Sequence, residues 1–265
     1  MNIDKRVAVA GATGRVGRHV VDVLKERGQD VVPISRANGV DVISGSGLIE
    51  ALTGVDYVID VSTGPSPVQI EATEFFTTAA RNLHQAADRA GVSRMVVVSI
   101  IGCDKFTAGY SAAKVAHEAS ALAGPIPVQV VRAAQFDEFV AELMSWGTQG
   151  DVCYVSTMRT QLVAARTVAE TLVDVALATD WAPTRHGPFP EIAGPREESL
   201  VEVAQLVAAH RGQPLTIEGV NNPDDPEHLE ETGGLLPSPH AILAGPTFRE
   251  WLDSQPREQR PTAAS

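Results

Sequence analysis

Two side chains four residues apart, Tyr110 and Lys114, are the clearest candidates for proton-transfer chemistry in this sequence. Residues at this spacing on a helix lie on one face, one turn from each other. A tyrosine with the usual pKa of about 10 exchanges protons poorly at neutral pH, and a neighbouring ammonium favours the phenolate and lowers that pKa. Because the same spacing occurs by chance in many helices, its meaning depends on the elements around it.

A glycine-rich segment near the N-terminus predicts a dinucleotide-binding turn between an apolar run and an amphipathic stretch. Gly11 lets the chain leave a strand through a tight turn, Gly14 lets a pyrophosphate approach the main chain, and Gly17 lets a helix pack closely on the strand. The N–H groups at the helix N-terminus would bind the phosphates. A strand, turn and helix with no ligand is the alternative interpretation. We assign to the cofactor the turn residues Gly11, Thr13, Gly14, Arg15, Val16 and Gly17.

The end of the second predicted strand, residues 30–36, bears on the choice of cofactor. An acidic residue here would bind the adenosine ribose, whereas an arginine accommodates a 2′-phosphate. The sequence has Ser35 and Arg36, so it favours NADP(H) over NAD(H) unless Arg36 is only a solvated loop residue. A short strand is predicted over 39–42, where Asp41 would lie near the adenine or cap a loop.

Strands and helices alternate through the next hundred residues. Strands are predicted over 55–61 and 95–101, with a long helix over 69–90 between them. This alternation predicts an α/β fold with a doubly wound parallel sheet. Ligands of such sheets bind outside the carboxyl ends of the strands, so Val61 and Ser62 should border the cofactor.

Composition narrows the choice of partners. The chain has 265 residues, 44% of them hydrophobic, and a net charge of −12, which disfavours nucleic acid and anionic membrane surfaces. Two cysteines cannot form a disulfide framework, no charged and then apolar leader precedes the first strand, and no apolar run approaches a membrane span. We expect a cytoplasmic protein that binds a small-molecule substrate and no metal, as a monomer or homodimer.

The segments at 11–17, Ser99, 110–114 and 131–136 together resemble the short-chain dehydrogenase/reductase superfamily, and within it the atypical, NmrA-like branch. The resemblance covers roughly residues 5–255. It implies a Rossmann-type domain and, in active members, Tyr110 as the acid/base, with Lys114 also binding the nicotinamide ribose and Ser99 as the orienting hydroxyl. It further implies that Gln135 and Phe136 face the nicotinamide and the substrate, although Phe136 could equally be a core residue.

These observations predict an NADP-binding domain over 1–134 plus about 160–194, and a small C-terminal substrate lobe over about 135–159 plus 195–254. Residues 255–265 are expected to form a tail, and Met144 and Trp146 either line a substrate pocket or pack inside the lobe. The predicted function is NADP(H)-dependent reduction of a carbonyl- or quinone-like molecule. The alternatives are a non-catalytic NADP(H)-binding redox sensor, and an epimerase or dehydratase that retains its cofactor.

Overall fold

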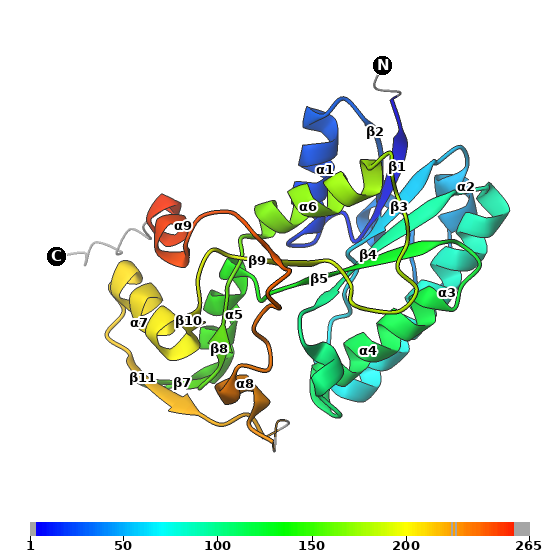
Figure 1. Cartoon of the computed structure of the whole chain (residues 1–265). Coiled ribbons are helices and arrows are strands. Elements are labelled where there is room, and N and C mark those ends of the chain that lie inside the picture. The colour runs from blue at the N-terminus through cyan, green and yellow to red at the C-terminus, as the bar shows by residue number, and fades with distance from the viewer. Residues whose placement is uncertain (1–3, 224, 226, 257–265) are drawn as a thin grey trace.

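A computed structural model describes residues 4–223, 225 and 227–256, and its centre is one parallel sheet (Figure 1). The sheet has the order β2-β1-β3-β4-β5-β9-β12, and each neighbouring pair is parallel. The apolar runs form these strands because both faces of the sheet are covered. The strands are β1 (Arg6–Ala10), β2 (Asp30–Ile34), β3 (Tyr57–Asp60), β4 (Arg94–Ile100), β5 (Val128–Ala133), β9 (Glu191–Ala193) and β12 (Ile242–Leu243).

Helices cover the two faces of this sheet. On one face, α1 (Gly17–Glu26) and α6 (Ala165–Leu177) pack against alternate strand residues such as Val7 and Val9. On the other face, α2 (Leu48–Leu52), α3 (Gln69–Ala90) and α4 (Gly109–Leu122) cover Ala8 and Ala10. The doubly wound α/β fold predicted from the alternation of strands and helices is therefore confirmed.

The strand predicted over 39–42 is wrong. The chain leaves β2 through a short 3-10 helix, η1 (Arg36–Asn38), and then turns through Gly39, whose φ is 76°. The Asp41 carboxylate accepts a hydrogen bond from the amide of Ile43 at 2.9 Å, and the Asp41 amide donates to the Ser46 carbonyl at 3.0 Å. These local hydrogen bonds replace strand pairing, so Asp41 caps a loop.

A smaller lobe lies beyond the carboxyl end of β5 (Figure 1). Its hydrophobic core includes Met144, whereas Trp146 is 56% exposed and packs edge-on against Phe139. Its helices are η3 (Asp137–Phe139), α5 (Val140–Gly147), α7 (Leu200–Arg211), α8 (Leu229–Thr232) and α9 (Phe248–Ser254). Its strands are β6 (Thr148–Gln149), β7 (Val152–Ser156) and β11 (Thr216–Val220) in one sheet, and β8 (Arg159–Thr160) and β10 (Glu198–Ser199) in another.

One segment of the predicted lobe range lies elsewhere, because β12 extends the main sheet beside β9. With two residues and no periodic pattern, β12 gives no strand signal in the sequence. Of the predicted tail, residues 257–265 lie outside the described residues. No helix in the described ranges is both long and apolar enough to cross a membrane.

Candidate functional site at the carboxyl edge of the sheet

The glycine-rich turn joins β1 to α1 at the carboxyl edge of the sheet. Gly11 has a φ of 79°, and a Cβ there would lie 2.8 Å from the Ser62 Cα, while a Cβ on Gly17 would lie 2.0 Å from the Gly11 carbonyl oxygen. Both positions therefore require glycine. No side chain caps the N-terminus of α1, and the amides of Arg15 and Val16 have no hydrogen-bond partner among the described residues. The turn can thus bind an anion through free N–H groups.

Two other predicted cofactor residues, Val61 and Ser62, follow β3 and lie against Gly11. The Val61 side chain belongs to the core on the α1 face. The Ser62 hydroxyl is buried and has no hydrogen-bond partner in the described part of the chain. A buried hydroxyl without a partner beside the glycine turn fits a polar ligand at this edge.

The Arg15 side chain lies across the boundary between the turn and the lobe. Its guanidinium donates a hydrogen bond to Glu142 of α5 and lies 5.2 Å from the centre of the Phe139 ring. Arg15 therefore connects the predicted phosphate-binding turn to the smaller lobe.

At the end of β2, the guanidinium of Arg36 forms no ion pair with any described residue. The Ser35 hydroxyl is hydrogen-bonded to Asn38 at 2.5 Å. Arg36 is exposed at the start of η1. An unpaired guanidinium here can bind a phosphate group.

Tyr110 lies in the first turn of α4, and its hydroxyl lies beside the carboxyl end of β3. The hydroxyl is 3.2 Å from that of Thr63, which follows β3, and the Tyr110 ring packs edge-on against Phe76. Burial raises the pKa of Tyr110, and the hydrogen bond with Thr63 opposes that rise. The predicted lowering of the Tyr110 pKa by a neighbouring ammonium is therefore wrong for this structure.

The reason is the direction of the Lys114 side chain. Its ammonium is 4% exposed and donates to the Val98 carbonyl at 2.9 Å, while lying 2.9 Å from Nδ1 of His117 and 4.4 Å from the centre of the Phe76 ring. Burial lowers the pKa of Lys114 to about 8. Lys114 thus lies beneath the edge, in contact with a histidine that the sequence analysis did not select.

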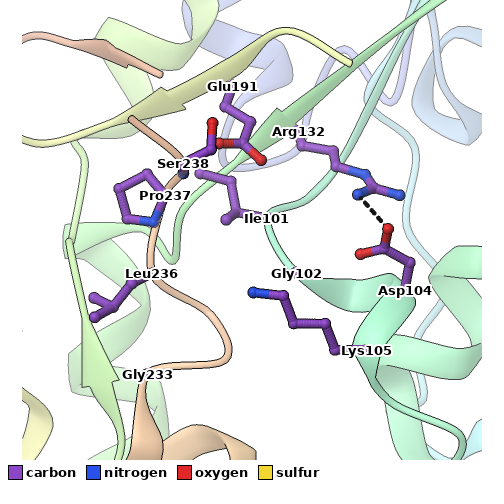
Figure 2. A pocket seen from close by; sticks show the side chains of 10 residues that line it. All are labelled: Ile101, Gly102, Asp104, Lys105, Arg132, Glu191, Gly233, Leu236, Pro237 and Ser238. Atoms are coloured by element: carbon purple, nitrogen blue, oxygen red, sulfur yellow. Dashed lines mark hydrogen bonds and ion pairs between the residues drawn. The ribbon is translucent and has the colours of Figure 1, made fainter. Parts of the chain in front are cut away.

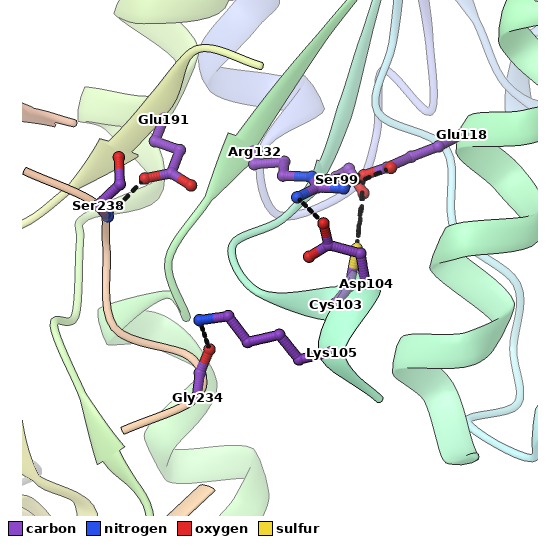
Figure 3. A network of polar contacts seen from close by, with 9 residues as sticks. All are labelled: Ser99, Cys103, Asp104, Lys105, Glu118, Arg132, Glu191, Gly234 and Ser238. Carbon is purple, nitrogen blue, oxygen red and sulfur yellow. Dashed lines mark hydrogen bonds and ion pairs between the residues drawn. The ribbon is translucent and has the colours of Figure 1, made fainter. Parts of the chain in front are cut away.

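Ser99 belongs to a separate network on the α4 face of the sheet (Figure 3). Its hydroxyl lies 3.8 Å from the Cys103 sulfur, and the Cys103 thiol in turn donates to Glu118 at 3.4 Å. Glu118 accepts two hydrogen bonds from Arg132, at 2.9 and 2.8 Å, while Asp104 lies 2.9 Å from the same guanidinium. Burial raises the pKa of Cys103 to about 11, so the thiol stays protonated at neutral pH. No hydrogen bond joins Ser99 to Tyr110, and Thr63 supplies the neighbouring hydroxyl.

A pocket of about 370 Å³ lies beside this network, between the segment after β4 and residues 233–238 of the lobe (Figure 2). The Lys105 ammonium donates to the Gly234 carbonyl at 2.8 Å, and Glu191 accepts from the Ser238 amide at 2.7 Å on the opposite wall. The lining residues are Ile101, Gly102, Asp104, Lys105, Arg132, Glu191, Gly233, Leu236, Pro237 and Ser238. None of these was selected from the sequence, because the pocket joins segments far apart along the chain.

The two residues expected to face the substrate lie outside this pocket. Gln135 accepts a hydrogen bond from the Thr160 hydroxyl at 2.6 Å, and Phe136 packs against the core on the α1 face. Their role toward a substrate stays a prediction. In the described ranges, no three His, Cys, Asp or Glu side chains are grouped as a metal site would need.

A parallel sheet wound on both faces, with an uncapped glycine turn at its carboxyl edge, is a Rossmann-type architecture. Residues 11–124 match a family model described as NAD(P)H-binding. This part of the chain is therefore similar to NAD(P)H-binding domains.

Solved structures agree on this fold. MoeE5 in complex with UDP-glucose and NAD has a TM-score of 0.71 and 20% identity, covering 94% of this chain and 97% of that one. A short-chain dehydrogenase/reductase superfamily protein from Agrobacterium tumefaciens with bound NAD has a TM-score of 0.66 and 16% identity, over 94% and 95% of the two chains. The Escherichia coli NADPH-dependent quinone oxidoreductase QOR2 with NADPH has a TM-score of 0.64 and 16% identity, over 93% and 98%. No curated protein sequence matches the chain.

Proposed function

We propose that the protein is an NADP(H)-dependent oxidoreductase that reduces a carbonyl- or quinone-like small molecule. The observation that carries this proposal is that the glycine turn and the Tyr110 hydroxyl lie at the same edge of the sheet. Two consecutive residues after β3 connect them: Ser62 lies against Gly11, and the Thr63 hydroxyl lies 3.2 Å from that of Tyr110. The turn would hold the pyrophosphate through the amides of Arg15 and Val16. When bound, the nicotinamide supplies the hydride.

Tyr110 is the proton donor in this proposal. A tyrosine hydroxyl with a raised pKa stays protonated at neutral pH, so it donates a hydrogen bond to the substrate oxygen and then transfers its proton as negative charge develops there. Thr63, at 3.2 Å, holds the phenol oxygen in place. Lys114, with a pKa of about 8, is mostly charged at neutral pH, and its ammonium would donate to an oxygen acceptor from beneath the edge.

The preference for NADP(H) rests on Arg36. Its exposed, unpaired guanidinium supports binding of a 2′-phosphate, and the carboxylate of nearby Asp41 is already bonded to the Ile43 amide. Titration calorimetry with NADPH and NADH tests this proposal. Arg36→Ala should weaken NADPH binding about tenfold, the loss of one charge-assisted hydrogen bond, and leave NADH binding unchanged.

Arg89→Ala is the matched control, because Arg89 is exposed in the last turn of α3 and its loss changes the net charge equally. Equal NADPH affinities for the two variants would contradict the role of Arg36. If neither NADPH nor NADH binds the unmodified chain, the oxidoreductase proposal itself is overturned.

A redox sensor is the second candidate, because neither Ser99 nor Lys114 is hydrogen-bonded to the Tyr110 hydroxyl. A sensor binds NADP(H) tightly without oxidising NADPH across a panel of carbonyl and quinone compounds. Cofactor that stays bound through purification, without net NADPH consumption, would instead support an epimerase or dehydratase.

A further inference from the structure

A chain of buried ionisable groups connects the carboxyl end of β3 to α4. Nζ of Lys114 lies 2.9 Å from Nδ1 of His117, and Nε2 of His117 lies 3.4 Å from Oδ2 of Asp60. The other Asp60 oxygen accepts the Ser62 amide at 2.9 Å. Lys114 is 4% exposed, and His117 and Asp60 are each 1% exposed. Unpaired charges at such depth are costly, so the contacts among the three groups decide which of them are charged.

The hydrogen-bonding capacities of these groups determine the histidine tautomer. An ammonium has three donors and no acceptor, so Nδ1 of His117 must accept from Lys114, and the imidazole proton must lie on Nε2. Oδ2 of Asp60 is the polar atom that faces Nε2, at 3.4 Å, and neither atom has a hydrogen-bond partner among the described residues. The Phe76 ring stacks on the imidazole with a centroid distance of 4.6 Å and an interplanar angle of 15°, which fixes the ring plane.

We propose that Asp60 and His117 are positioning residues that keep Lys114 charged inside the protein and fix the direction of its ammonium. His117 and the Val98 carbonyl take two of the three N–H groups. The third has no partner among the described residues and is available to an oxygen acceptor. This inference rests on the proposed function only where that acceptor is taken to belong to the cofactor.

The charges around Lys114 support this assignment. Burial is the main influence and lowers the Lys114 pKa to about 8, while the negative charge of Asp60 opposes the decrease most strongly and Glu118 opposes it as well. Burial and the adjacent ammonium lower the pKa of His117, so its imidazole is neutral at neutral pH. Without Asp60, the ammonium would lose its strongest electrostatic support.

The titratable side chains in and around this buried set come from four elements. Asp60 lies on β3, His117 and Glu118 lie on α4, and Cys103 lies on the 3-10 helix η2 (Cys103–Lys105). From α3, His84 faces Asp60 but has its own backbone partners, the Ala121 carbonyl at 2.8 Å and the Ile126 amide at 3.4 Å. His84 is therefore a buried histidine that does not belong to the set formed by Lys114, His117 and Asp60, and it provides a matched control.

Nuclear magnetic resonance tests the inference without substrate or cofactor. Long-range ¹H–¹⁵N spectra of the full chain should show His117 in the Nε2–H tautomer at pH 7. The ¹³Cε resonance of Lys114 should titrate near pH 8. In Asp60→Asn the midpoint should fall by about one pH unit, a tenfold change in the proton affinity of Lys114. His84→Gln should leave that midpoint unchanged.

A purely structural role for the polar chain would lower stability in Asp60→Asn without moving the Lys114 midpoint, and that result would overturn the inference. A proton on Nδ1 of His117 at pH 7, or a charged imidazolium, would also overturn it. If Asp60→Asn does not fold, the His117 tautomer in the unmodified chain decides the inference, because Nδ1 can accept from the Lys114 ammonium only when it carries no proton. Failure of NADPH to bind would refute the proposed function and leave these spectra unaffected.

Discussion

Replacing Gly17 by alanine tests the link between close packing at the glycine turn and nucleotide binding. A Cβ at this position would lie 2.0 Å from the Gly11 carbonyl oxygen, and real Cβ contacts are essentially never shorter than 3.0 Å, so the carbonyl or the helix must move by about 1 Å. The same carbonyl accepts the Gly14 amide at 2.9 Å and so closes the turn. The substitution therefore acts on the peptide groups that would bind the pyrophosphate.

The expected size follows from three contributions. Overpacking costs about 1–3 kcal/mol, and loss of the hydrogen bond between Gly14 and Gly11 costs about 1 kcal/mol. The higher helix propensity of alanine offsets at most about 1 kcal/mol. The free energy of unfolding should fall by about 1–3 kcal/mol, and NADPH affinity should fall at least about tenfold because the amides of the turn are displaced.

Urea unfolding and titration calorimetry measure these two effects. Gly28→Ala is the control, since Gly28 follows the same helix with a φ of 72° and nothing within 4 Å of an added Cβ. It should cost about 1 kcal/mol of backbone strain and leave NADPH affinity unchanged. Unchanged stability and affinity in Gly17→Ala would refute the packing argument.

Three further predictions concern single side chains. Tyr110→Phe should abolish NADPH oxidation with any carbonyl compound that the unmodified protein reduces, and it should leave NADPH binding nearly unchanged. Undiminished turnover would remove Tyr110 from the mechanism. Glu118→Gln should lower the free energy of unfolding, measured in urea, by about 3 kcal/mol, because Arg132 then keeps only half-exposed Asp104 as a charged partner. The control is Glu170→Gln at an exposed ion pair, which should lower it by less than about 0.5 kcal/mol. Burial raises the pKa of Asp137 from 3.8 to about 8, so the folded state retains a proton that the unfolded chain releases, and stability should fall as pH rises from about 4 to about 8. Asp137→Asn should flatten that dependence in urea midpoints measured across this range, and parallel profiles for the two proteins would contradict it.

The sheet and its glycine turn could be predicted because their signals are local. Strands such as β1 are short apolar runs, and the steric reason for Gly17 concerns its own turn, whereas an added Cβ on Gly11 would meet Ser62 beyond β3. The short strand expected over 39–42 failed for an equally local reason. The Asp41 side chain bonds to the backbone two residues later and stabilises a loop, which apolar periodicity does not reveal.

The contacts at the site could not be predicted in the same way. Spacing along α4 places Tyr110 and Lys114 on one side of the helix, but it does not say where a four-carbon side chain ends, and the ammonium turns inward to His117. The hydroxyl partner of Tyr110 is Thr63, 47 positions away, so only the folded sheet brings the two together. The three-residue spacing from Lys114 to His117 was a signal in the sequence that pointed to the buried pair.

The last strand of the sheet affects how the chain is made. Ile242 and Leu243 pair with Ile192 and Ala193, both fully buried, and residues 194–241 separate the two strands. A ribosome adding about 5–20 residues per second therefore needs about 2–10 s after completing β9 before β12 can cover its edge. During that interval the nascent sheet ends in an apolar strand with unpaired backbone groups, which is a template for aggregation. A shortened chain that stops before residue 242 would keep this edge permanently open, so the C-terminal segment also covers the edge of the main sheet.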